Sequence, residues 1–297
     1  MIQIDCINNE VCLGQKEIIF VVELVMKQYK IAFFGVKSWE KEIIEREIIN
    51  LDATGVGIFC QELHEDIEMA AKYDIVSVFI YSKIDKNVLD KLLNLKMIAT
   101  RSTGMDHIDI EECKKRKIEV MNVPTYGSNT VAEYTIALLL AVAKRIVPAH
   151  QSVEEGEFSP EGLTGIDIFG KTLGVVGVGR IGKNVIRIAK GLGMKIIAVD
   201  KNGDLENCLK KSDFLTFHVP AIPETRHLLN LKNIKLMKKG SILINTSRGK
   251  VVKTEAIIYG LANGILWGAG LDVTEDEELV ESVAMVSSTR PTKDDLQ

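Results

Sequence analysis

Short apolar runs alternate with amphipathic stretches along most of the chain. In the first half, runs that predict strands lie at 30–35, 75–82, 96–102 and 119–123, and stretches that predict helices lie at 39–49, 87–95 and 108–117. Strands that alternate with helices form βαβ units, which build a parallel sheet covered by helices on both faces. The pattern therefore predicts an α/β domain over residues 27–124.

The second half of the chain repeats this alternation. Apolar runs at 172–176, 195–200, 213–220, 240–249 and 267–273 predict strands, and the stretch at 180–193 predicts a helix. We therefore expect a second doubly wound parallel-sheet domain over residues 125–285.

The two ends of the chain do not follow the pattern. Residues 1–26 precede the first convincing strand, and we expect a leader there that is either a gene-start artefact or a frayed extension. An extra edge strand formed by "EIIFVVELV" is the alternative. Residues 286–297, "VSSTRPTKDDLQ", carry no apolar rhythm, so we expect a disordered tail.

The stretch "NTVAEYTIALLLAVAKRI" at 129–146 is apolar on nearly every face. A helix of this kind must be buried all round, either in a large core or against a partner subunit. We favour the partner subunit and therefore expect a homodimer.

Composition then excludes several classes of protein. The 37 basic residues are outnumbered by 41 acidic ones and form no extended run, which gives no reason to expect nucleic acid. The longest apolar stretches, at 18–22 and 136–143, are far shorter than the roughly 18 residues of a membrane span. The five cysteines are scattered without the spacing of metal ligands. Their odd number favours free thiols in the cytoplasm and predicts no metal site.

The strongest chemical signal is a glycine motif between a strand and a helix. Gly177, Gly179 and Gly182 form G-x-G-x-x-G directly after the run "TLGVV". The first glycine allows a tight turn, the second lets a pyrophosphate approach the backbone, and the third lets helix and strand pack closely. The N–H groups at the start of the helix, including those of Arg180 and Ile181, are suited to an anion. The motif predicts a Rossmann dinucleotide-binding domain.

The following strand indicates which dinucleotide is bound. It ends in Asp200, whose carboxylate can accept hydrogen bonds from ribose hydroxyls and would repel a 2′-phosphate. NAD is therefore preferred over NADP, although the neighbouring Lys201 weakens that preference.

Two later strands end in residues that could carry chemistry. The first ends in His218, which by itself is more often a structural residue than an acid or base. The other ends in Thr246, Ser247 and Arg248. The guanidinium of Arg248 could grip a substrate carboxylate with two hydrogen bonds, or it could be only a surface charge.

Several motifs taken together resemble those of a known family. The motifs "RSTGMDHID" (101–109), "NVPTYGSNTVAEYTIALLLA" (122–141), "GVVGVGRIG" (174–182), "HVPAIPETRHLLN" (218–230), "INTSRG" (244–249) and "GAGLDV" (268–273) resemble the D-isomer-specific 2-hydroxyacid dehydrogenases. Within that family, "VPTYGSN" and "FFGVKSWE" are most similar to D-lactate dehydrogenases. The resemblance implies a flavodoxin-like substrate domain, a Rossmann NAD-binding domain and hydride transfer between NADH and a 2-oxo acid such as pyruvate.

The resemblance also implies roles for individual residues. Arg248 would hold the carboxylate and carbonyl of the substrate, backbone N–H groups near Thr103 and Gly104 would bind the carboxylate, and Tyr126 would line the pocket. Glu277 matches the acid that pairs with the catalytic histidine and raises its pKa. Asp272 would orient the nicotinamide carboxamide. The other expected NAD contacts are His218, Val219, Pro220, Thr225, Thr246 and Ser247.

The sequence departs from the family pattern after Glu277. The family's catalytic histidine follows that glutamate, whereas His64, His107, His150, His218 and His227 all precede it here. We therefore expect a truncated or shifted reading frame near residue 280 and feeble or absent turnover. His107 is a weak candidate for a substitute proton donor. A second departure is Lys253, where relatives carry aspartate; Thr254 could cap the following helix instead.

Two hypotheses remain open. The chain is either a truncated NAD-dependent D-2-hydroxyacid dehydrogenase or a non-catalytic NAD-binding scaffold or sensor of the same fold. Retention of Arg248 and Glu277 favours the enzyme, because a buried acid without its partner is costly to keep.

Overall fold

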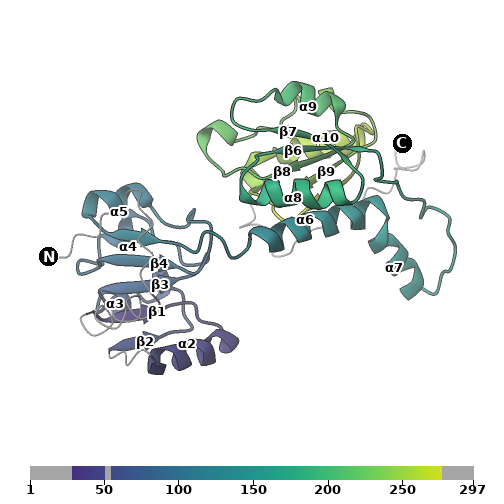
Figure 1. Cartoon of the computed structure of the whole chain (residues 1–297). Coiled ribbons are helices and arrows are strands. Elements are labelled where there is room, and N and C mark those ends of the chain that lie inside the picture. Colours follow the sequence, from purple (N-terminus) through teal and green to yellow (C-terminus); the bar gives the residue numbers. More distant parts are fainter. Residues whose placement is uncertain (1–28, 51–54, 276–297) are drawn as a thin grey trace, which may run out of the picture. The chain divides into compact units, whose positions relative to one another are not determined.

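The computed structural model describes residues 29–50 and 55–275. The chain divides into two compact units, one that ends at Tyr126 and one that begins at Gly127, which we call unit 1 and unit 2. Both are α/β structures, and each is built on one parallel sheet (Figure 1). The expected leader, the expected tail and Glu277 lie outside the described residues.

Unit 1 contains a five-stranded parallel sheet with strand order β2-β1-β3-β4-β5. The strands are β1 (Ile31–Phe33), β2 (Val56–Ile58), β3 (Ile75–Val78), β4 (Met97–Thr100) and β5 (Glu119–Met121). The helices are α2 (Ser38–Asn50), α3 (Ile67–Ala70), α4 (Lys86–Leu89), α5 (Ile110–Arg116) and the 3-10 helix η1 (Leu63–Glu65). This order is that of a flavodoxin-like sheet.

The core of unit 1 gathers around the central strands. All four residues of β3 are buried, which agrees with the continuous apolar run that a central parallel strand requires. Phe34, Leu63, Ile84 and Ile98 are completely buried beside it. The loops at the carboxyl ends of β1, β3 and β4 are thereby fixed on a rigid base.

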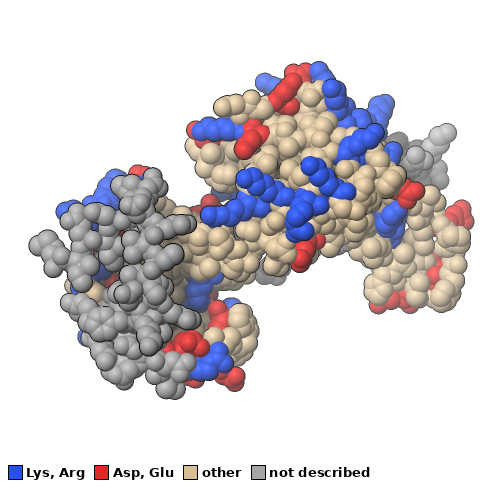
Figure 2. All heavy atoms as spheres, viewed as in Figure 1, with Lys and Arg blue, Asp and Glu red and all other residues tan. Residues whose placement is uncertain are grey.

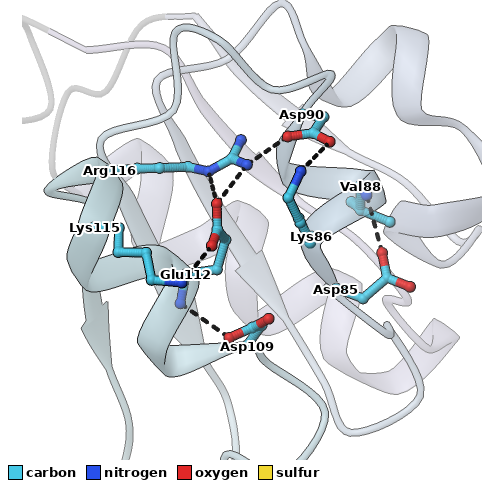
Figure 3. Close-up of polar contacts among 8 residues, drawn as sticks. All are labelled: Asp85, Lys86, Val88, Asp90, Asp109, Glu112, Lys115 and Arg116. Atoms are coloured by element: carbon cyan, nitrogen blue, oxygen red, sulfur yellow. Dashed lines mark hydrogen bonds and ion pairs between the residues drawn. The ribbon is translucent and has the colours of Figure 1, made fainter.

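Side chains also connect α4 and α5 on the surface of unit 1 (Figure 3). Asp85 and Asp109 cap the two helices by accepting backbone N–H groups of their first turns. Arg116 contacts both Glu112 on its own helix and Asp90 at the end of α4. Exposed ion pairs stabilise little individually, so this network mainly fixes the orientation of the two helices.

Unit 1 differs from the sequence prediction at its smallest elements. The helix expected at 87–95 covers only Lys86–Leu89 and then continues as turns, and neither β2 nor α3 was predicted. The three residues of β2 are only half-buried and include Gly57, so they lack the apolar run that marks the other strands.

Unit 2 contains a second five-stranded parallel sheet, with strand order β10-β9-β8-β6-β7. The strands are β6 (Thr172–Val176), β7 (Lys195–Val199), β8 (Phe214–Phe217), β9 (Ser241–Asn245) and β10 (Leu266–Leu271). The helices are α6 (Ser128–Ala143), α7 (Ile146–Glu154), α8 (Arg180–Gly191), α9 (Leu205–Lys211) and α10 (Thr254–Ala262). The described part of unit 2 also contains the 3-10 helices η2 (Pro223–Thr225), η3 (Ile234–Leu236) and η4 (Gly249–Val251).

The strand order of unit 2 reverses at β6. The chain goes from β6 to β7 on one side and then returns to β8 on the other. In open α/β sheets, the crevice at such a reversal is where ligands bind. Helices α6 and α8 pack on one face of this sheet, and α9 and α10 pack on the other (Figure 1).

Helix α6 corrects part of the expectation for the stretch at 129–146. Most of its apolar residues are buried within unit 2 against α8, β9 and β10, including Ala132, Ile136, Leu139 and Val142. Its all-round apolar character is therefore largely explained by the chain's own core. The remaining exposed face includes Glu133 and Tyr134.

Among residues 29–50 and 55–275, no helix is long and apolar enough to cross a membrane. Of the cysteines in the same ranges, Cys60, Cys113 and Cys208 carry free thiols, and burial raises the pKa of the latter two.

Candidate active site

The glycine turn between β6 and α8 lies at the reversal of the sheet. Gly177 has φ +96, and a Cβ there would collide with the carbonyl of His218. A Cβ at Gly182 would collide with the carbonyl of Gly177. Gly179 is different, because its φ is −70 and a Cβ would meet no atom within 4 Å. The protein's own backbone requires the first and third glycines, whereas its packing gives no reason for the second, which leaves open space for a ligand.

The start of α8 adds positive potential beside Gly179. The helix has no side-chain cap and no acidic residue in its first turn, so the positive end of its dipole is not offset by a carboxylate there. Arg180, Lys183, Arg187 and Lys190 are exposed along one side of α8. Figure 2 shows basic side chains gathered over this part of unit 2. Both features suit a pyrophosphate.

Asp200 lies at the carboxyl end of β7, next to the glycine turn. Gly177 N–H donates to the carbonyl of Val199, which places the turn and the end of β7 side by side. The Asp200 side chain is exposed, and its Oδ1 accepts the Lys201 N–H at 3.0 Å. The carboxylate is thus presented to solvent, where ribose hydroxyls could reach it.

His218 lies directly across the turn from Gly177. Its backbone N–H donates to Val176, and its Nε2 lies 3.1 Å from the Thr216 hydroxyl. Its Nδ1 is buried and has no hydrogen-bond partner. Burial lowers the pKa of His218 to about 4. A neutral imidazole with one unsatisfied buried nitrogen is a group that a cofactor could complete.

Hydrogen bonds within the turn after His218 stabilise its shape. The Thr225 hydroxyl donates to the carbonyl of Pro220 and accepts the N–H of Ile222 at 3.0 Å. The single proton of Thr225 is therefore used inside the loop. These bonds indicate that Thr225 stabilises the loop that carries Val219 and Pro220. They give no direct support for a contact between Thr225 and a cofactor.

The loop after β9 holds Thr246, Ser247 and Arg248 in place. Ser247 donates to Asn245 Oδ1 through both its N–H and its hydroxyl, and Asn245 Nδ2 donates to the Arg248 carbonyl. The Arg248 guanidinium is half-buried, and its Nη1 donates to the Ser247 carbonyl at 2.8 Å. Arg248 is therefore anchored just beyond the carboxyl end of β9 and differs from a solvated surface charge.

Thr246 also connects the crevice to α6. Thr135 donates its hydroxyl proton to the Val131 carbonyl, so in its 2.7 Å contact with Thr246 it must accept. Thr246 is thereby the donor in that contact, and only its lone pairs remain for a ligand.

Tyr134 was not predicted as a site residue. Its hydroxyl forms a side-chain hydrogen bond with Asp272, the residue that follows β10 and was expected near the nicotinamide. Burial raises the pKa of Asp272, and the bond from Tyr134 opposes that rise. Only the position of Tyr134 within the "AEYT" motif could have suggested this role.

His227 and Glu275 form a second arrangement that the sequence did not reveal. His227 Nε2 and Glu275 Oε1 are hydrogen-bonded, and Glu275 Oε2 accepts the Thr254 N–H at 3.0 Å. The N-cap residue of α10 is Lys253, which provides no side-chain cap. The expectation that Thr254 caps this helix was wrong, because the carboxylate of Glu275 does so. Glu277 follows two residues later, outside the described part of the chain.

The remaining predicted residues lie in unit 1, in and after the loop that follows β4. Thr103 Oγ1 donates to the Val123 carbonyl at 3.0 Å, and Asn122 Nδ2 donates to the Thr103 carbonyl at 2.7 Å. Tyr126 is 63% exposed at the end of the unit. The residues expected to contact NAD therefore lie in unit 2, and those expected to bind the substrate carboxylate lie in unit 1.

Residues 136–291 match the model of the D-isomer specific 2-hydroxyacid dehydrogenase NAD binding domain. The chain belongs to this family. A glyoxylate reductase of Thermococcus litoralis is 44% identical over 231 residues, which cover 71% of this chain and 70% of that protein. A 2-hydroxyacid dehydrogenase homolog of Haemophilus influenzae is 37% identical over 264 residues, covering 84% and 79% of the two chains.

A solved structure is also similar. The D-lactate dehydrogenase of Aquifex aeolicus, complexed with NAD and lactic acid, superposes with a TM-score of 0.76 at 36% identity, covering 84% of this chain and 78% of that one. The family assignment and the fold expected from the sequence are thereby confirmed. The cofactor of the family is NAD, and the open backbone at Gly179, the uncapped α8 and the unsatisfied Nδ1 of His218 fit it.

Proposed function

We propose that this protein is a D-2-hydroxyacid dehydrogenase of the D-lactate dehydrogenase type, acting on pyruvate or a similarly small 2-oxo acid. The single observation that carries the proposal is the space beside Gly179 at the uncapped start of α8, where the sheet reverses. The anchored guanidinium of Arg248, at the tip of β9, supports a substrate with a carboxylate.

Roles follow for the residues of the chain. When bound, NAD supplies the acceptor or donor of a hydride. The N–H groups of Arg180 and Ile181 and the glycine turn would bind its pyrophosphate, and Asp200 would bind ribose hydroxyls. Asp272, hydrogen-bonded to Tyr134, would hold the carboxamide. Arg248 would bind the substrate carboxylate and polarise its carbonyl. The N–H groups near Thr103 and Gly104 would bind the same carboxylate, beside Tyr126.

The nature of the substrate within this class is part of the proposal. A relative named glyoxylate reductase is 44% identical to the chain, and a solved structure named D-lactate dehydrogenase is 36% identical, so both names are candidates. The motifs "VPTYGSN" and "FFGVKSWE", which resemble those of D-lactate dehydrogenases, favour the lactate type. Measuring NADH oxidation with pyruvate and glyoxylate separately distinguishes the two.

A polypeptide of these 297 residues should bind NADH but turn over slowly. It contains no histidine after Glu277. Loss of a positioned general acid typically removes about 10²- to 10⁴-fold in rate. The test is a fluorescence titration with NADH, followed by pyruvate-dependent NADH oxidation. Absence of NADH binding by folded protein refutes the proposed function. Turnover in the ordinary range of roughly 1–10³ per second refutes the claim that these 297 residues lack a general acid.

The second candidate is an NAD-binding scaffold or sensor of the same fold. The anchored Arg248 favours the enzyme, because a guanidinium that binds a substrate carboxylate is not needed merely to hold a nucleotide. Binding of oxamate, an unreactive analogue of pyruvate, to the NADH-loaded protein distinguishes them, since a sensor has no reason to bind it.

We also infer that the protein is a homodimer. No residue of α7 is buried, and α7 extends beyond the sheet of unit 2 (Figure 1). Ile146 and Val153 on this helix are both 53% exposed, and Phe158 beyond it is 85% exposed. Several exposed apolar side chains on one helix and in the segment after it favour an interface. A cytoplasmic location remains a prediction.

A further inference from the structure

The loop after β4 contains a chain of three side-chain hydrogen bonds that the proposed function does not use. His107 Nε2 lies 3.1 Å from Thr100 Oγ1, and Thr100 Oγ1 lies 2.7 Å from Ser102 Oγ. Ser102 Oγ donates to the Gly104 carbonyl at 2.6 Å. Thr100 and Ser102 are buried, so these groups cannot exchange their partners for water.

The direction of every bond in this chain is fixed by the number of protons. A hydroxyl donates only one hydrogen bond, and Ser102 uses its proton on the Gly104 carbonyl. Thr100 must therefore donate to Ser102, and has no proton left for His107. His107 must donate, which requires a proton on Nε2.

This chain of hydrogen bonds ends on a backbone segment, residues 102–104, in which each of the three carbonyls accepts a hydrogen bond. Val123 N–H donates to the Ser102 carbonyl at 3.0 Å, and Asn122 Nδ2 donates to the Thr103 carbonyl. The Gly104 carbonyl is held by Ser102. In a trans peptide the C=O and the following N–H point in opposite directions. The N–H groups of Thr103, Gly104 and the next residue are therefore directed away from these three anchors.

These N–H groups are available to a ligand. Within the described residues, those of Thr103 and Gly104 donate to no protein acceptor. Gly104 has no Cβ and can adopt a wide range of backbone angles, so the peptide planes on both sides of it need external support. Asn122 supports the first plane, and the hydroxyl chain supports the second.

We propose that His107 is a positioning residue for binding of the substrate carboxylate: through Thr100 and Ser102 it fixes the peptide plane that follows Gly104. The proposal rests on the proposed function, because the carboxylate is that of the 2-oxo acid. His107 is thereby assigned to holding the loop, and its Nε2 proton is committed to Thr100 rather than to a substrate carbonyl.

The first test reads the ring directly and needs no ligand. Burial lowers the pKa of His107, with Asp106 and Glu62 opposing the shift, so the ring is neutral at neutral pH. Nitrogen-15 NMR of the imidazole rings of the full chain, with His107 assigned from His107→Leu, should show the neutral Nε2–H tautomer at pH 7.5. An Nδ1–H tautomer overturns the proposal.

The second test measures oxamate binding to the NADH-loaded protein by calorimetry. Thr100→Val removes two bonds of the chain and His107→Leu removes one. Each variant should weaken oxamate binding about five- to tenfold, while NADH affinity in unit 2 stays within twofold. His107→Gln keeps an N–H donor and should recover most of the affinity. Ser77→Ala is the matched control, because it removes a buried hydroxyl of the neighbouring strand that contacts Arg101 instead.

The outcomes separate this inference from the proposed function. Failure to bind NADH contradicts the proposed function. The tautomer of His107, which is measured without a ligand, still shows whether the hydrogen bonds from His107 through Thr100 to Ser102 run in the proposed direction. Oxamate affinities that are equal in Thr100→Val, His107→Leu and Ser77→Ala overturn the positioning role, as does an NADH-loaded protein that binds no oxamate.

Discussion

The three glycines of the turn after β6 have different physical reasons to be glycine. Gly177 and Gly182 are required by the protein's own backbone, whereas Gly179 has an ordinary φ and faces open space. A sequence motif alone assigns all three to a nucleotide. The structure separates the stabilising positions from the position that only a ligand needs.

This difference predicts opposite phenotypes for two similar substitutions. Gly179→Ala should leave the melting temperature almost unchanged and weaken NADH binding at least tenfold, because the methyl group would occupy the place proposed for the pyrophosphate. Gly182→Ala should lower the free energy of unfolding by about 1–3 kcal/mol, since the new Cβ forces the helix away from the turn. Thermal unfolding and NADH titration of both variants check this. Unchanged NADH affinity in Gly179→Ala contradicts the placement of the cofactor.

A second prediction at the scale of residues concerns acid sensitivity. His218 has a pKa of about 4 in the folded protein, below its ordinary value of 6.5, because burial disfavours the charged ring. The folded state is therefore favoured above pH 6.5 and loses stability as the pH falls from 6.5 towards 4. The loss between pH 7 and pH 5 should be about 2 kcal/mol.

Urea unfolding at several pH values measures this loss. His218→Gln cannot be protonated and should flatten the dependence between pH 7 and pH 5, with any remaining slope due to other groups. A variant that keeps the full slope of the unsubstituted protein would show that another group is responsible.

At the scale of elements, the strands of the two sheets were predictable because central parallel strands are continuous apolar runs. β3, β8 and β9 are buried at every residue, and the sequence shows each as such a run. The half-buried β2 and the four residues of α3 carry too few apolar positions to give a period. The cap of α10 was also unpredictable, because Glu275 is brought to Thr254 by the fold and not by proximity in sequence.

The cap leads to a prediction for α10. Although burial raises it, the pKa of Glu275 is lowered overall by hydrogen bonds from Thr254 and His227, so the carboxylate is ionised at neutral pH. Glu275→Ala should destabilise the protein by about 1–2 kcal/mol through loss of the cap. Adding Lys253→Asp should restore part of this, because aspartate at the N-cap position can replace the missing acceptor.

Chemical denaturation of the single and double variants tests the cap, with Glu255→Ala as the control. Glu255 lies in the first turn of the same helix with an exposed side chain, and its removal should change stability by less than about 0.5 kcal/mol. An equal loss in both single variants argues against a specific cap.

At the scale of the whole molecule, the sequence predicted two parallel-sheet units and the glycine turn, because both depend on local patterns. It did not predict that both described sheets share one strand order, nor the pairs Tyr134–Asp272 and His227–Glu275. Such pairs join residues that are far apart in the sequence. Only the packed fold determines which side chains meet.

The exposed apolar side chains of α7 give a prediction for assembly. Analytical ultracentrifugation at micromolar concentration should give the mass of a dimer, and Ile146→Glu combined with Val153→Glu should give a monomer, because two charges are buried without partners at the interface. Leu93→Glu is the control, since Leu93 is an exposed apolar residue of unit 1. A monomeric unsubstituted protein would refute the homodimer.

The basic side of α8 has a kinetic consequence. The protein carries a net charge of −4, yet Arg180, Lys183, Arg187 and Lys190 are exposed beside the expected pyrophosphate site. Local positive potential of this kind guides an anion during diffusion and is screened by salt over about 8 Å at physiological ionic strength. Capture of NADH should therefore slow as salt rises, whereas its escape, governed by short-range contacts, should change little. The enzyme would then collect its cofactor by long-range attraction while repelling other anions elsewhere on its surface.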